Sequence, residues 1–157
     1  MSGPPFWDWA LAAYAAPGVA EACLDLQDTH DQNVPLLLWA AWCARTGRRL
    51  DADDLDAACD TARVWTDAAI VPLRDLRRRL KSTIPDMDTD DRLAVREQIK
   101  AVELDAERRL MSALEALAPA PGGAARPALD ALVDLSRRRD RVTPRPALAA
   151  LADRLPA

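Results

Sequence analysis

The residue types best suited to chemistry gather between residues 27 and 33. A carboxylate, an imidazole and an amide lie within seven residues there, and such groups can bind a metal ion or transfer protons. His30 is the only histidine of the chain, and its surroundings match no metal-ligand spacing such as HExxH. Polar residues at a junction between helices also satisfy free backbone groups. The sequence therefore favours a structural role for this cluster over an enzymatic one; its members are Gln27, Asp28, His30, Asp31 and Asn33.

The cysteines are not spaced as a metal or redox site. Cys23, Cys43 and Cys59 lie far apart, are odd in number and form no CxxC pair. Each has apolar neighbours on a predicted helix, which is typical of reduced thiols in the core of a cytoplasmic protein. We therefore expect no structural metal, and no motif indicates a cofactor.

Aromatic residues are the stronger lead. The chain has five tryptophans, of which four fall on the first and third predicted helices. Tryptophan is enriched at interface hot spots, but the simpler interpretation is an aromatic core that joins these helices. An exposed groove or a ligand pocket remains the alternative. The candidate binding residues are Phe6, Trp7, Trp9, Trp39 and Trp42.

Hydrophobic periodicity predicts helices throughout and no β-strand. The expected fold is an all-α bundle that begins with a three-helix unit. A long antiparallel hairpin follows, with a kink near Pro72 and with Leu93 and Val102 on its buried side. Two short helices end the chain. The expected helices span 5–16, 18–29, 34–46, 52–81, about 88–117, 128–138 and 145–155.

Composition divides the chain into three parts. Residues 4–117 are expected to form the helical bundle domain, and the Pro-, Ala- and Gly-rich residues 118–127 a linker. Residues 128–157 then form the short helical pair. Because their apolar stripes are weak, we expect this pair to be loosely attached and dispensable for folding of the bundle.

Charge and hydropathy exclude several classes of partner. The formal net charge is −4, which disfavours nucleic acids and anionic membranes as general partners. The longest apolar run, 34–44, is too short to span a bilayer, and the N-terminus has no basic region typical of a secretory signal. These features predict a cytoplasmic protein without a membrane partner. The arginine run within 137–141 leaves an acidic partner or RNA open locally.

One stretch of the chain resembles a known family. The run FWDWALAAYAAPGVAEACLDLQD, residues 6–28, is followed by NVPLLLW, residues 33–39. This string is similar to the signature of an uncharacterised family of small all-helical bacterial proteins, a domain of unknown function. The family often has glycine at the position of Asp31 and asparagine at that of Pro35, so the turn there is locally altered. The resemblance implies an all-helical fold and no activity.

These observations favour a non-enzymatic protein-interaction or adaptor module, with a protein partner or a second copy of the chain as its target. One alternative is a regulator that holds a small ligand in a Trp-lined pocket. Another is an enzyme that uses Asp28, His30 and Asn33. A convergent polar pocket would favour the enzyme, and an open apolar groove the adaptor.

Overall fold

The structure is a computed structural model that describes residues 3–156. Within that range every regular element is a helix, which confirms the predicted all-α bundle. The helices are α1 (Phe6–Ala15), α2 (Val19–His30), α3 (Val34–Arg45), α4 (Ala52–Trp65), the π-helical turn η1 (Thr66–Ile70), α5 (Val71–Arg79), α6 (Thr89–Leu117), α7 (Ala128–Arg139) and α8 (Arg145–Arg154).

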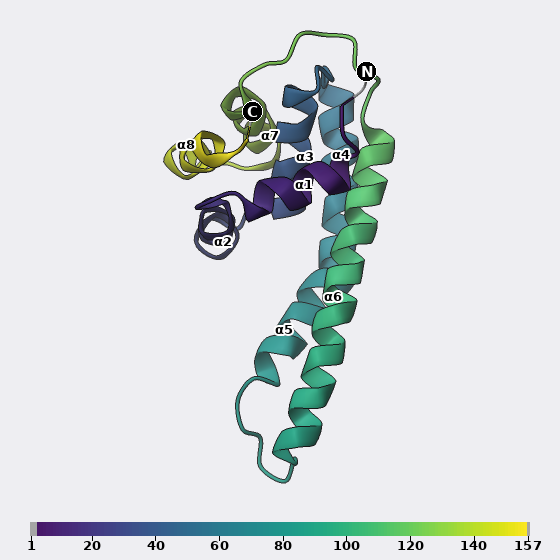
Figure 1. Cartoon of the computed structure of the whole chain (residues 1–157), viewed down its shortest axis with the longest axis vertical. Coiled ribbons are helices and arrows are strands. Elements are labelled where there is room, and N and C mark those ends of the chain that lie inside the picture. Colours follow the sequence, from purple (N-terminus) through teal and green to yellow (C-terminus); the bar gives the residue numbers. More distant parts are fainter. Residues whose placement is uncertain (1–2, 157) are drawn as a thin grey trace.

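The helices form a body and a long arm (Figure 1). α1, α2, α3, α7 and α8 gather around one end of the α4–α6 hairpin, and α3 contacts both α6 and α7. α5 and the first half of α6 extend away from this body as a two-helix arm. The predicted antiparallel hairpin is therefore present, and only its inner half is covered by other helices.

Local signals in the sequence place the helix starts. The Asn33 side chain accepts the Leu36 N–H at 3.0 Å and so caps α3, while Pro35 occupies the first turn, where no ladder bond is lost. Asp51 and Asp54 form a reciprocal capping box at the start of α4. These caps fix the residues at which α3 and α4 begin.

α3 is the centre of the body. Every residue from Leu36 to Ala44 is buried, as expected for a helix that is apolar all round. Trp39 and Trp42 are fully enclosed, and the Phe6 ring lies 5.3 Å from the Trp42 ring, centroid to centroid. The Trp42 Nε1 donates to the Pro4 carbonyl at 3.1 Å, which ties the start of the chain to this core.

The C-terminal pair belongs to the same core, which corrects the expected loose attachment. α7 packs on α3 and α8 packs on α2. The connecting segment is also fixed, because the Gly122 and Gly123 N–H groups donate to the Gly47 carbonyl, at 3.1 and 2.9 Å. That residues 118–127 link two separate parts of the chain stays a prediction. Four leucines of the pair are at most 1% exposed, namely Leu132, Leu135, Leu148 and Leu151.

A π-helical turn lies just before Pro72, near which the sequence predicts a kink. Pro72 lacks an N–H, and its ring would collide with the carbonyl four residues back in a regular helix. The chain widens just before it, so that the Val71 N–H donates to the Thr66 carbonyl five residues back. This turn lies where the hairpin leaves the body, next to α6.

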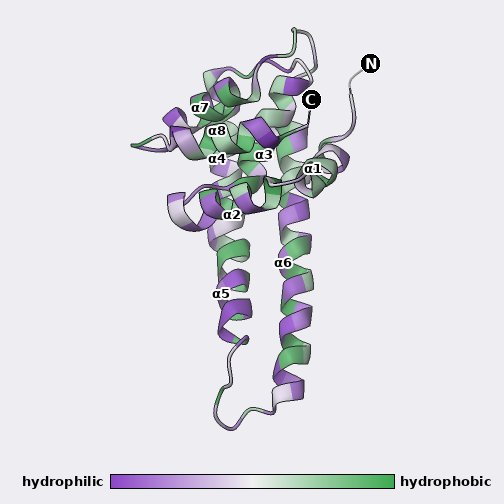
Figure 2. Cartoon of the chain, turned by 60° about the vertical axis from the view of Figure 1, so that its left-hand side comes forward, coloured by the Kyte–Doolittle hydropathy of each residue, from purple (hydrophilic) through white to green (hydrophobic). Residues whose placement is uncertain are grey.

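The arm contradicts one part of the expected periodicity. Leu93 and Val102 are 40% and 51% exposed, although the pattern places them on the buried side. The positions that face α5 include Arg92, whose Nε donates to the Leu80 carbonyl at 3.0 Å, and the buried Glu103. Figure 2 shows the result, with hydrophilic and hydrophobic residues both distributed along α5 and α6.

Candidate functional site

An apolar pocket opens where α1, α2, α3 and α6 meet. Its volume is about 260 Å³. α1 contributes Trp7, Leu11 and Tyr14 to its walls, and α3 contributes Leu38 to its inner side. The helices that form it are adjacent because α1 crosses both α3 and α6 on its way to α2.

The rim of this pocket is apolar and open to solvent. Leu11 is 53% exposed, Tyr14 43%, Leu24 50% and Leu104 58%, and all four line the same pocket. Single exposed apolar residues need no explanation, but a contiguous patch around a hollow marks a binding surface. The four residues, together with Trp7, are called the rim below.

Trp7 is the one candidate tryptophan that reaches the pocket. It is half-buried, and the Arg108 guanidinium lies 4.8 Å from the centroid of its ring. Trp9, two residues further along α1, is only 7% exposed. Residues two apart on a helix point about 200° apart, so at most one of them can face the bundle centre. The structure confirms that expectation and identifies Trp9 as the inner one.

The other aromatic candidates lie in the core. Phe6, Trp39 and Trp42 are at most 2% exposed, so none of them presents a surface to a partner. The residue types and spacing of these three aromatics reflect the packing of α1 on α3. Of the aromatic residues predicted to bind a partner, only Trp7 therefore lies where a partner could contact it.

Leu24, Leu104 and Glu107 are among the pocket residues that were not predicted as binding residues. Leu24 lies outside the apolar stripe of α2, whose buried members are Val19, Cys23 and Leu26. An apolar residue on the polar face of a helix is the signal that could have identified it. Leu104 gives the same signal on α6.

Polar residues on the pocket wall include Glu107, from α6, and Gln27, from α2, which is one of the predicted polar candidates. Glu107 Oε1 accepts from Arg74 Nη2 at 3.2 Å, and burial is the main cause that raises the pKa of Glu107 above its usual range. Partial burial also raises the pKa of the Tyr14 phenol, with the nearby Glu107 and Glu21 contributing. In both cases burial disfavours the charged form of the side chain.

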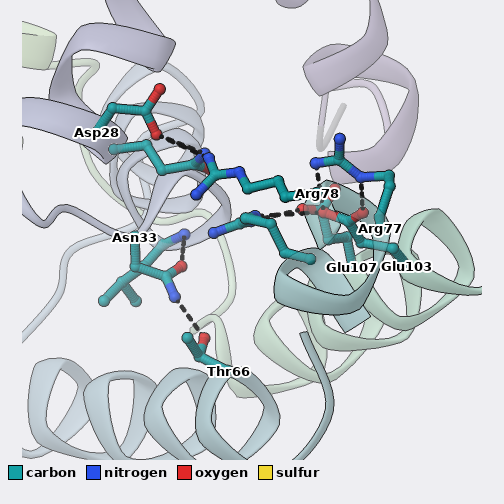
Figure 3. A network of polar contacts seen from close by, with 10 residues as sticks. Asp28, Asn33, Thr66, Arg77, Arg78, Glu103 and Glu107 are labelled. Atoms are coloured by element: carbon teal, nitrogen blue, oxygen red, sulfur yellow. Dashed lines mark hydrogen bonds and ion pairs between the residues drawn. The ribbon is translucent and has the colours of Figure 1, made fainter. Parts of the chain in front are cut away.

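An ion-pair network holds Arg74 beside Glu107. Glu103 is buried and accepts from the Arg74 Nε at 3.2 Å and also from the Arg77 Nε (Figure 3). Arg74 is shared between the two carboxylates, and Arg77 supplies a second positive charge to Glu103, so the network is balanced. The pairs join α5 to α6 beside the pocket, because Glu107 also lines the pocket wall.

The polar cluster at residues 27–33 converges only in part, because Gln27, Asp31 and Asn33 line a small polar hollow of about 80 Å³ that Asp28 and His30 do not line. Asn33 caps α3 and donates to the Thr66 Oγ1 at 2.8 Å, while Asp28 accepts from Arg78 at 3.3 Å (Figure 3). His30 lies 3.7 Å from Asp25, and Gln27 donates to the neighbouring Asp28 at 3.3 Å. Within residues 3–156, no group of three or more His, Cys, Asp or Glu side chains is placed to hold a metal.

The thiols are shielded from chemistry. Cys23 and Cys43 are buried, and burial raises the pKa of each to about 12. Cys59 is half-buried, and its pKa is also raised, mainly by burial. A thiol with a raised pKa is protonated near neutral pH and is a poor nucleophile. Cys23 lies in the wall of the pocket as an apolar group.

The part of the chain that the structure describes is thus all-helical, and an open apolar pocket lies where α1, α2, α3 and α6 meet. Residues 5–114 match the model of the family described as "Protein of unknown function (DUF2390)", and the chain belongs to that family. Comparisons with curated proteins and with solved structures give no match. Within residues 3–156 no helix has the length and apolar character that crossing a membrane requires.

Proposed function

We propose that this chain is a non-enzymatic protein-interaction module that binds a bulky apolar side chain of a partner in the pocket. One observation carries this proposal: the rim residues are half-exposed and surround a preformed hollow. Binding hot spots are apolar or aromatic anchors that fill such pockets and exclude water. The engagement of Asp28 and Asn33 in ion pairing and helix capping supports the non-enzymatic part.

Pocket size favours a side chain over a whole small molecule. Sites for drug-sized ligands commonly have volumes of about 300–1,000 Å³. The volume here is about 260 Å³, with the opening on the rim side. One or two large side chains from a partner surface suit that space. The shielded thiols agree with a reducing compartment, so the proposal places the protein in the cytoplasm.

The test removes the apolar rim without disturbing the core. Peptides selected from a random display library on the full chain provide the probe, and Leu24→Asp is the variant. Because Leu24 is 50% exposed, folding should survive, while binding should fall by about thirtyfold or more, as for a hot spot. Fluorescence anisotropy of a labelled peptide gives the affinity, and circular dichroism checks the fold.

Val142→Asp is the matched control. Val142 is 79% exposed and lies between α7 and α8, away from the pocket. It should leave the affinity unchanged. Equal affinity of the selected peptides for both variants and the unmodified chain would contradict the proposed site.

A further inference from the structure

The charge pattern of the pocket indicates which partner it accepts. Among the described residues that line the pocket, Glu107 alone carries a formal charge. Its Oε1 is bonded to Arg74, whereas no hydrogen bond to its Oε2 occurs within residues 3–156. A carboxylate oxygen at the edge of an apolar hollow has room for one more donor, and a cationic donor is the strongest kind.

Charged residues of both signs lie around the pocket. Tyr14, on the rim, lies near both Glu107 and Glu21. The Arg108 guanidinium lies over the Trp7 ring. Arg74 is occupied by Glu103 and Glu107 together. Because Arg77 also pairs with Glu103, the two arginines balance the two glutamates, and an incoming cation meets the second carboxylate oxygen of Glu107, not an excess of negative charge.

A second hollow continues the pocket along α6. It shares Tyr14, Leu104 and Glu107 with the apolar pocket, and its other walls are mostly charged, with residues of both signs: Arg77, Glu97, Lys100 and Glu103. Glu107 lies where the two hollows meet. The site as a whole has an apolar end, a carboxylate at the junction and a polar groove parallel to α6. This arrangement, from apolar end to polar groove, suits an elongated amphipathic peptide segment and not a compact ligand.

We propose that the partner presents an amphipathic peptide segment whose apolar side chain fills the pocket and whose neighbouring Lys or Arg donates to Glu107. Because residues three or four apart share a face of a helix, the basic residue should follow or precede the anchor at that spacing. This inference rests on the proposed function and adds the chemistry of the partner to it. Apolar burial supplies the affinity, and the Glu107 pair selects the register and the sign of charge.

The experiment uses the selected peptides and an isosteric change at the carboxylate. Glu107→Gln keeps the shape of the side chain and its bond from Arg74 but removes the charge. We expect selected peptides to carry Lys or Arg beside the apolar anchor, and Glu107→Gln to weaken them by about tenfold. Replacing that Lys or Arg by Met in the peptide should cause a similar loss. The protein change and the peptide change together should weaken binding little more than either change alone, because both remove the same interaction.

Asp105→Asn is the matched control. Asp105 lies two residues before Glu107 on the outer side of α6, where it pairs with Arg109 at 2.9 Å, and it does not line the pocket. Its removal should leave peptide affinity unchanged. Peptides that depend on Leu24 but are indifferent to Glu107→Gln would overturn this inference and leave the proposed function standing. Peptides indifferent to Leu24→Asp would overturn both. Binding of octylamine at the site, with no peptide enriched, would assign the pocket to small amines and overturn the peptide partner.

Discussion

A chain that ends at Leu117 is expected to lose its cooperative unfolding transition. The truncation removes α7 from α3 and α8 from α2, together with four leucines that are at most 1% exposed. Full burial of a leucine contributes about 1.5–3 kcal/mol, so these four account for roughly 6–12 kcal/mol. That sum rivals the whole free energy of unfolding of a typical domain, about 5–15 kcal/mol. Calorimetry of the truncated and complete chains gives the comparison.

Adding residues 118–157 back as a separate polypeptide is the control for this experiment. If the loss reflects missing core contacts, the added polypeptide should restore a transition in a concentration-dependent way. A sharp transition in the truncated chain alone would instead support a folding boundary at residue 117, as the sequence-based division proposes. The two results separate a shared core from an attached tail.

The second large effect is expected at Trp9. Replacing this buried side chain by alanine leaves a cavity and should lower the free energy of unfolding by roughly 3–5 kcal/mol. Trp7→Ala is the matched change on the same helix. It removes a half-buried ring and its contact with Arg108, so the expected loss is only about 1 kcal/mol, but peptide binding should weaken.

Urea denaturation of both variants, with peptide anisotropy beside it, checks this contrast. The reverse order, with Trp7→Ala the more damaging to folding, would mean that the two sides of α1 are assigned wrongly. Equal losses of stability with unchanged binding at Trp7→Ala would remove that residue from the site. Analytical ultracentrifugation of the same samples shows whether a second copy of the chain is the partner.

Much of the fold follows from local patterns. The uninterrupted apolar run of α3 predicts a helix buried on all sides, because no face of it can contact water. Asn33 and Asp51 are recognisable as caps from their type and position before apolar helices. Pro72 marks the irregular turn in the hairpin, although a proline alone does not say whether a kink or a π-helical turn results.

The arm shows where local patterns fail. Periodicity places Leu93 and Val102 inward, yet both are exposed, because only α5 lies beside that part of α6. Two helices have no third layer to cover their flanks, and polar groups such as Glu103 take the inner positions through ion pairs. How far the body reaches along a helix is a tertiary property that one periodic segment does not encode.

The site was only partly predictable for a related reason. Trp7 could be identified by residue type, but its partners Leu104 and Glu107 come from α6, about a hundred positions later in the chain. No motif spacing links residues that meet only through packing of α1 on α6. The weak C-terminal stripes were misleading as well, because α7 needs only a narrow apolar face to cover α3.

Site-specific photo-crosslinking tests the central claim most directly. A photoreactive phenylalanine analogue at Leu24, on the rim, and another at Val142, far from it, would be placed in the full chain within the producing cell. The account predicts a covalent adduct with a discrete polypeptide from position 24, reduced by Glu107→Gln, and none of that adduct from position 142. Absence of any adduct at position 24, or the same adduct from both positions, would contradict the assignment of the pocket as the partner-binding site.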